Sequence, residues 1–195
     1  NQKYLGTFKY NHLKNLEKTD LFEDNFIFIS QYRDKSTIEK FYGDFDFFYR
    51  SEKKLLTNLC QLTNNYYNKK LFFKSSFRDL LSFDNNDEYD FFDKMGLLKK
   101  EISNNEIFHQ YDENIYFTID STMTFELLSL KKKILVYPHR NIYNVHSQSE
   151  VWDLFKKELP EIIVSKDLSD LKSKIDNILN ISYEDYYKLI SKFVP

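Results

Sequence analysis

Short apolar runs alternate with helical patterns along most of this chain, and that alternation limits the possible folds more than any other feature. The runs with strand character are FIFIS (26–30), LFF (71–73), LLKKEIS (97–103), IYFTI (115–119), ILVY (134–137) and EIIVS (161–165). Strands that alternate with helices form βαβ units, whose strands are parallel and whose helices cover both faces of the sheet. The pattern therefore predicts an α/β fold with a doubly wound, mostly parallel, Rossmann-like sheet of about six strands.

Apolar residues recur at helical spacing between these runs. Helices are expected at 47–67, 88–96, 107–111, 122–130 and 151–159, and two more close the chain. The polar segment 31–44 is expected to be a loop. No repeat, low-complexity tract or linker interrupts the alternation, so residues 1–195 are expected to form a single domain.

Composition and motifs exclude several functional classes. A net charge of −2 gives no bulk attraction for nucleic acid, and no apolar run reaches the length of a transmembrane helix. The single cysteine excludes an internal disulfide and fits the reducing cytoplasm. The four histidines lack ligand spacing, so neither a metal nor a cofactor is expected. With only three glycines, the chain has no G-x-G-x-x-G or P-loop motif, and no G-x-S-x-G elbow.

Candidate binding residues follow the predicted strands. Ligands of parallel α/β sheets bind outside the carboxyl ends of the strands. The residues in that position are Arg33, Lys74, Ser121, Thr122, His139 and Arg140. Tyr32 could stack on a base there, although packing is the favoured role for one of 15 tyrosines.

The turn Asp120-Ser121-Thr122 is the most informative of these sites. If Ser121 or Thr122 caps the following helix, the first-turn N–H groups and the helix dipole favour a phosphate. Glu126 lies one turn further along, where its carboxylate could accept hydrogen bonds from ribose hydroxyls. The alternative is a helix cap without a ligand, since Ser, Thr and Asp are common at helix starts.

The same stretch resembles the nucleotide-binding half of GT-B glycosyltransferases that assemble bacterial surface carbohydrates. The family pattern D-S-T-x-x-x-E-L, followed by a lysine and a strand, is matched by Asp120, Ser121, Thr122, Glu126, Leu127 and Lys133. The glycine that is common before the final strand is here Lys131 or Lys132. The segment YLGTFKYNHL is similar to the family's G-S-x-R-N entry segment, and FIFISQYRDKS to the first strand and loop of its C-terminal domain.

The resemblance implies roles for the candidate residues. Ser121 and Thr122 would hold the donor phosphate, and Glu126 would hold the ribose. Lys74 fits a basic position of the family, but no histidine follows it, and Arg78 is a substitute. Arg33 and Arg140 could hold phosphate or a sugar carboxylate, and His139 could contact base or phosphate. One candidate donor is a CMP-linked acidic sugar, while UDP, GDP and CDP donors stay open.

A GT-B enzyme has two Rossmann-like halves, and this chain has room for one. The resemblance thus implies a cytoplasmic donor-binding half, peripheral at the inner membrane through other parts of the protein. The acceptor, a glycan or lipid-linked sugar, and the catalytic groups would then belong to an N-terminal domain outside this chain. The rival hypothesis is a non-catalytic α/β module that binds a phosphorylated metabolite or a partner protein.

Overall fold

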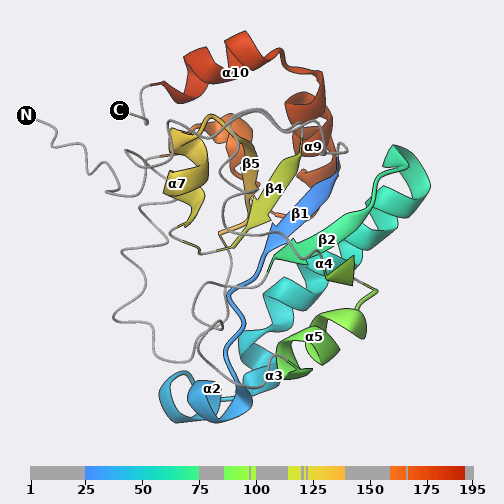
Figure 1. Ribbon diagram of the computed structural model, residues 1–195, viewed down its shortest axis with the longest axis vertical. Coiled ribbons are helices and arrows are strands. Elements are labelled where there is room, and N and C mark those ends of the chain that lie inside the picture. The colour runs from blue at the N-terminus through green and yellow to red at the C-terminus, as the bar shows by residue number, and fades with distance from the viewer. Residues whose placement is uncertain are drawn as a thin grey trace, which may run out of the picture.

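The computed structural model describes residues 25–74, 86–96, 98–99, 114–119, 121, 123–138, 159–165 and 167–191. These residues form a β-sheet with helices on both faces (Figure 1). The strands are β1 (Phe26–Ile29), β2 (Leu71–Lys74), β3 (Leu98–Lys99), β4 (Ile115–Thr118) and β5 (Lys133–Val136). The α-helices are α2 (Lys35–Phe41), α3 (Phe45–Phe48), α4 (Arg50–Leu62), α5 (Asn86–Asp93), α7 (Met123–Ser129), α9 (Leu171–Asn180) and α10 (Tyr183–Ile190).

The sheet is parallel, with the strand order β3-β2-β1-β4-β5. The chain builds outward from β1 to β2 and β3, then returns to the other side of β1 to add β4 and β5. The order therefore reverses between β1 and β4, where Phe26 of β1 pairs with Ile115 of β4. This is the arrangement of Rossmann-like sheets, whose ligands bind at such a reversal. The predicted α/β class and parallel sheet are confirmed.

The described residues form five strands, where about six were predicted. Four strands have four residues each, and β3 has only two. The last apolar run, EIIVS, is a 3₁₀ turn at Glu161–Ile163. Only Val164 reaches the sheet, in a single parallel bridge to Val136. Ser165 N then donates to Val136 O (2.8 Å), while the Ser165 side chain bonds to Asp170 ahead of α9.

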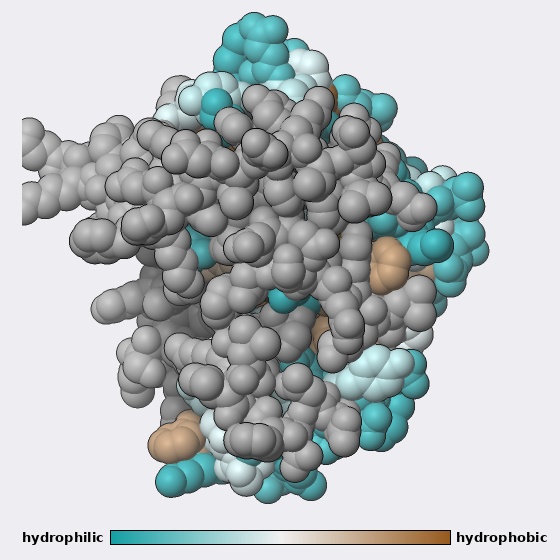
Figure 2. All heavy atoms as spheres, viewed as in Figure 1, coloured by the Kyte–Doolittle hydropathy of each residue, from teal (hydrophilic) through white to brown (hydrophobic). Residues whose placement is uncertain are grey.

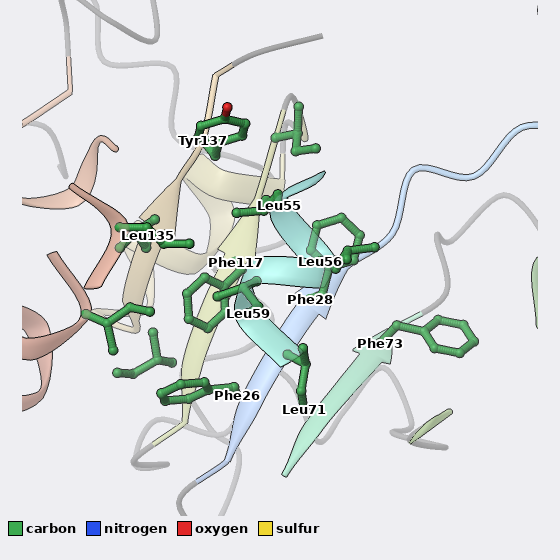
Figure 3. Close-up of a cluster of buried hydrophobic side chains, with 14 of the residues drawn as sticks. Phe26, Phe28, Leu55, Leu56, Leu59, Leu71, Phe73, Phe117, Leu135 and Tyr137 are labelled. Atoms are coloured by element: carbon green, nitrogen blue, oxygen red, sulfur yellow. The ribbon is translucent and has the colours of Figure 1, made fainter. Parts of the chain in front are cut away.

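Alternate residues of β1, β4 and β5 supply two separate cores. Phe26 and Phe28 of β1 face α4, α5 and α9, in the core shown in Figure 3. Ile27 and Ile29 face the opposite way, against α7 and α10. All four side chains are at most 2% exposed. Burial on both faces is expected of the central strand in a parallel sheet, and it explains why FIFIS is uniformly apolar.

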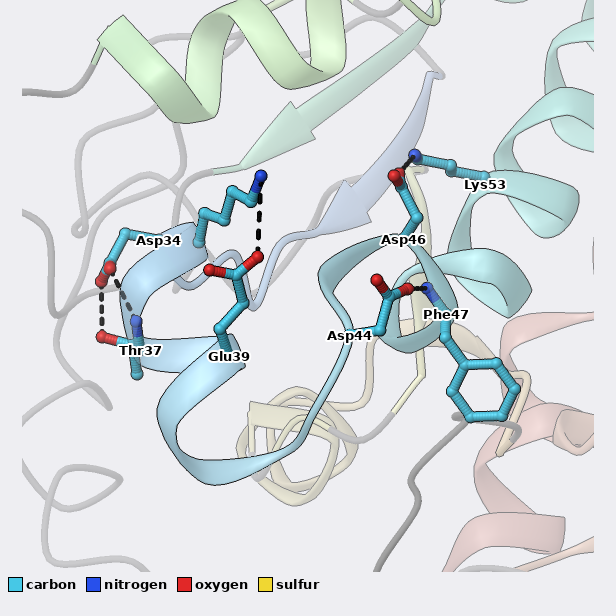
Figure 4. A network of polar contacts seen from close by, with 8 residues as sticks. Asp34, Thr37, Glu39, Asp44, Asp46, Phe47 and Lys53 are labelled. Carbon is cyan, nitrogen blue, oxygen red and sulfur yellow. Dashed lines mark hydrogen bonds and ion pairs between the residues drawn. The ribbon is translucent and has the colours of Figure 1, made fainter.

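The segment 31–44, predicted to be a loop, contains the whole of α2. Asp34 caps this helix, because its carboxylate accepts hydrogen bonds from Thr37 N (2.9 Å) and Thr37 Oγ1 (2.6 Å). Asp44 caps α3 in the same way through Phe47 N (Figure 4). Ile38 of α2 is fully buried with Phe48 and Tyr49. One buried apolar side chain and a good cap are enough for two helical turns here.

Helix α10 is fastened to the edge strand β5 by Tyr186. Its hydroxyl donates to Lys132 O (2.8 Å) and accepts from Ile134 N (3.1 Å), and the side chain is fully buried. Lys131 precedes this contact with a φ of +60°, a backbone region that favours glycine. The left-handed residue lets the chain end α7 and enter β5.

The face of the molecule in Figure 2 shows mostly hydrophilic residues among those described, with isolated hydrophobic ones. No helix in the described part of the chain is long and apolar enough to cross a membrane.

Candidate functional site

The reversal between β1 and β4 brings together two segments that the sequence predicted to bind ligand. The chain leaves β1 through Ser30, Tyr32 and Arg33, and it leaves β4 toward Ser121 and α7. Neighbouring strands are about 4.8 Å apart, so the two exits begin side by side at the carboxyl edge of the sheet. Arg33 and Ser121 therefore follow adjacent strands.

Ser121 is the N-terminal cap of α7. Its hydroxyl oxygen accepts a hydrogen bond from Met123 N (3.2 Å), and its carbonyl accepts one from Thr124 N (3.0 Å). The side chain is buried, with 5% of its surface exposed. The predicted cap is thus present. The hydroxyl uses a lone pair for Met123, and no residue that the structure describes accepts its proton, which can therefore be donated to an anion.

The start of α7 is held to β4 by a second hydroxyl pair. Thr118 Oγ1, at the end of β4, lies 2.9 Å from Thr124 Oγ1, and both side chains are fully buried. This hydrogen bond fixes the first turn of the helix relative to the strand. Glu126 lies in that first turn and is partly exposed. Among the described residues, its carboxylate makes no hydrogen bond or ion pair, so both oxygens can accept from a ligand.

Arg33 is held at both its backbone and its side chain. The buried Tyr49 hydroxyl accepts from Arg33 N (2.7 Å) and donates to Arg33 O (3.2 Å). The guanidinium donates to the Tyr42 hydroxyl, and its central carbon lies 5.0 Å from the centroid of the Tyr42 ring. The guanidinium offers five N–H donors. Within the described chain Tyr42 takes one of them, and the others are available.

Buried carboxylates lie on the α4 and α5 side of the same edge. Ser30 Oγ donates to Glu88 Oε1 (2.5 Å) and accepts from Tyr32 N (2.9 Å). Glu88 is in the first turn of α5, and Glu52 is in the first turn of α4, with exposures of 4% and 1%. Each of these carboxyl groups already occupies the N-terminal end of its helix, the position that favours an anion. The start of α7 carries a hydroxyl there instead, so it is the better place for a phosphate.

The remaining predicted site residues are placed less centrally or fall outside the description. Lys74 ends β2, beside Ile29 of β1, and its carbonyl accepts from Ser30 N (2.9 Å). It is therefore one strand away from the reversal. Thr122, His139 and Arg140 lie outside the described residues, as do Arg78 and the segment YLGTFKYNHL.

Tyr32 packs rather than presenting a free ring. Its ring stacks on Tyr49 at a centroid distance of 5.9 Å and meets the edge of Phe45 at 6.3 Å. Phe91 and Phe92 of α5 complete the surrounding cluster. The packing role that the sequence favoured is confirmed.

Sequence reasoning missed Tyr49 and Glu88 as parts of this edge. The sequence places Tyr49 in the helix predicted at 47–67 and Glu88 at the start of the helix predicted at 88–96. Their partners, Arg33 and Ser30, are 16 and 58 residues away, so no local pattern could reveal the contacts. In the described part of the chain, no cluster of three or more His, Cys, Asp or Glu side chains could hold a metal ion.

No protein-family model, curated protein or solved structure significantly matches the chain.

Proposed function

We propose that this chain is the donor-nucleotide-binding half of a GT-B glycosyltransferase that builds a bacterial surface glycan. One observation carries the proposal: Arg33 and Ser121 follow the two strands between which the sheet order reverses. That reversal is the usual ligand site of an open parallel sheet. A residue that favours an anion is thus present on each side of it.

The contacts of the β4–α7 turn are compatible with a nucleotide. Ser121 keeps a donor hydrogen, and helix N–H groups face the carboxyl edge, where a phosphate would lie. Glu126 follows in the first turn, and its carboxylate, which bonds to no described residue, would accept from ribose hydroxyls. The left-handed Lys131 supports the resemblance as well, because its conformation suits the glycine that is common there in the family.

In this proposal the chain supplies binding and leaving-group stabilisation. Ser121, Thr122 and the start of α7 hold the donor phosphate, with Arg33, Lys74, His139 and Arg140 supplying polar and positive groups around it. Their charge favours departure of the nucleotide without a metal ion. The acceptor and the catalytic base belong to a partner domain, so the isolated chain binds the donor but does not turn it over.

Nucleotide titration by isothermal calorimetry tests the proposal. CMP, UMP, GMP and their diphosphates are titrated into the wild type, Ser121→Ala and Glu126→Gln. We expect millimolar or tighter binding of one base class, and losses of about three- to tenfold in each variant, the value of one or two hydrogen bonds.

Matched controls separate a ligand contact from a helix cap. Ser182 caps α10 by accepting from Asp185 N (3.1 Å), and Glu184 is an exposed first-turn acid of that helix. Ser182→Ala likewise removes a helix cap and Glu184→Gln a first-turn acid, yet both should leave nucleotide binding unchanged. If no nucleotide binds, the glycosyltransferase proposal fails. Binding of phosphate with no preference for a nucleoside would favour the rival module for phosphorylated metabolites.

A further inference from the structure

Arg33 is fixed more firmly than a surface arginine. Its backbone N–H and C=O both bond to one hydroxyl, that of Tyr49, whose side chain is fully buried. Tyr49 is itself packed between the rings of Phe45 and Phe91, with centroid distances of 4.9 Å to each. The position of the Arg33 backbone is therefore set by the aromatic core and not by the loop.

The side chain of Arg33 has its own support. The Tyr42 hydroxyl accepts from the guanidinium, and the Tyr42 ring packs on Phe48. Freezing an arginine side chain before binding removes much of the rotamer entropy that binding would otherwise cost. A guanidinium held in this way is preorganised for a planar or tetrahedral anion.

The neighbouring acid does not neutralise this arginine. Asp34 is next in the chain, but its carboxylate accepts from Ser36 Oγ, Thr37 N and Thr37 Oγ1 at the start of α2. No ion pair of Arg33 occurs in the described part of the chain. The positive charge is therefore left for a ligand.

We propose that Tyr49 and Tyr42 are positioning residues that hold Arg33 ready for a second anionic group of the ligand. This inference rests on the proposed function, in which the first phosphate lies at α7. The second group would be the distal phosphate of a nucleoside diphosphate, or the carboxylate of a sugar joined to a monophosphate. The ligand class is thus a nucleotide with two separated anionic groups.

The test compares ligands that differ by one anionic group. Calorimetry gives the ratio of dissociation constants for a nucleoside monophosphate and its diphosphate, in the wild type, Arg33→Gln, Tyr49→Phe and Tyr42→Phe. A non-hydrolysable CMP analogue of an acidic sugar and its carboxamide form a second pair that distinguishes carboxylate from phosphate. Tyr66→Phe is the matched control, since Tyr66 is 64% exposed.

We expect Arg33→Gln to lower the preference for the dianionic member about 10- to 100-fold, the usual effect of a charge-assisted hydrogen bond. Tyr49→Phe and Tyr42→Phe should lower it about three- to tenfold while monophosphate affinity stays unchanged. A merely structural tyrosine would weaken both ligands equally, and that result would overturn the inference. An unchanged preference in Arg33→Gln would overturn it too.

The outcomes also separate this inference from the proposed function. If a nucleotide binds through Ser121 but ignores Arg33, the function stands and the inference falls. If no nucleotide binds, the function falls and the same variants are titrated with pyrophosphate and phosphate. Arg33-dependent preference for pyrophosphate would then uphold the arginine site, and absence of pyrophosphate binding would overturn it.

Discussion

Replacing Tyr186 by phenylalanine removes one oxygen from a fully buried side chain and keeps its ring. The hydroxyl joins α10 to two backbone groups at the start of β5, Lys132 O at 2.8 Å and Ile134 N at 3.1 Å. Both of those residues are themselves fully buried. Water cannot replace the lost partner without opening the contact, so a buried donor and a buried acceptor are both left unsatisfied.

The expected cost follows from those two groups. An unsatisfied buried polar group costs about 1–3 kcal/mol, so we expect Tyr186→Phe to lower the free energy of unfolding by about 3 kcal/mol. Domains have a total of about 5–15 kcal/mol, so this is a large part of the stability. In a chain of this size the melting temperature should fall by roughly 6–12 °C.

Urea unfolding followed by circular dichroism measures the change. Tyr187→Phe is the control, because Tyr187 is the next residue of the same helix and is 38% exposed. Its ring keeps the contact with Lys131 Nζ, which lies 4.0 Å from the centroid, so a change below about 0.5 kcal/mol is expected. If Tyr186→Phe and Tyr187→Phe unfold at the same urea concentration, the Tyr186 hydroxyl does not stabilise the contact between α10 and β5, and the prediction is refuted.

Two further predictions concern pH. Hydrogen bonds from Ser36 and Thr37 lower the pKa of Asp34 to about 2, below its ordinary value in an unfolded chain. The cap therefore stabilises fully above about pH 4, and this contribution is lost as the pH falls toward 2. Asp34→Ala should lower the free energy of unfolding by about 1 kcal/mol at pH 7. The urea midpoints of the variant and the wild type should converge at low pH. A difference between the midpoints that does not change with pH would contradict this. Burial raises the pKa of Tyr186, and burial with the Asp176 hydrogen bond raises that of Tyr67. In a spectrophotometric titration near pH 10, fewer than the 15 tyrosines of the native protein should ionise, whereas all of them should ionise in urea. The free energy of unfolding should fall above that pH, because the folded state holds these protons more tightly. Full ionisation of the folded protein near pH 10 would refute this prediction.

The sheet was predictable because its signals are local. The runs at 26–30, 71–73, 115–119 and 134–137 each hold three or four apolar side chains in a row or nearly so, and each contributes to a strand. The run at 161–165 is also apolar but forms a 3₁₀ turn, because an apolar run does not specify its register or its partner strand. The strand predicted at 161–165 was wrong because tertiary contacts, which the local pattern does not contain, decide the conformation there.

Helix α2 was missed although its start carries a signal. Asp34 followed by Ser36 and Thr37 is a capping sequence, and the structure uses it in that way. The polar surroundings and a single buried residue, Ile38, gave too weak a helical period to be recognised.

The candidate site also has one part that the sequence predicts and one part that it does not. The Ser121 cap was predictable from three residues in a row, while the support of Arg33 by Tyr49 depends on the packing of helix α3 against the loop after β1. Such a contact cannot be read from spacing, because it exists only once the aromatic cluster has formed.

The pairing of β1 with β4 has a consequence for how the protein folds during synthesis. Asn25 N donates to the side chain of Asn114 (3.0 Å), 89 residues further along the chain, and Asn25 O accepts from Ile115 N (3.0 Å). The central strand β1 is synthesised early, but it cannot pair with β4 until β4 has left the ribosome. Contacts so distant in sequence make folding slow. Until then one edge of FIFI is exposed, so this segment should be prone to chaperone binding and aggregation in the nascent chain.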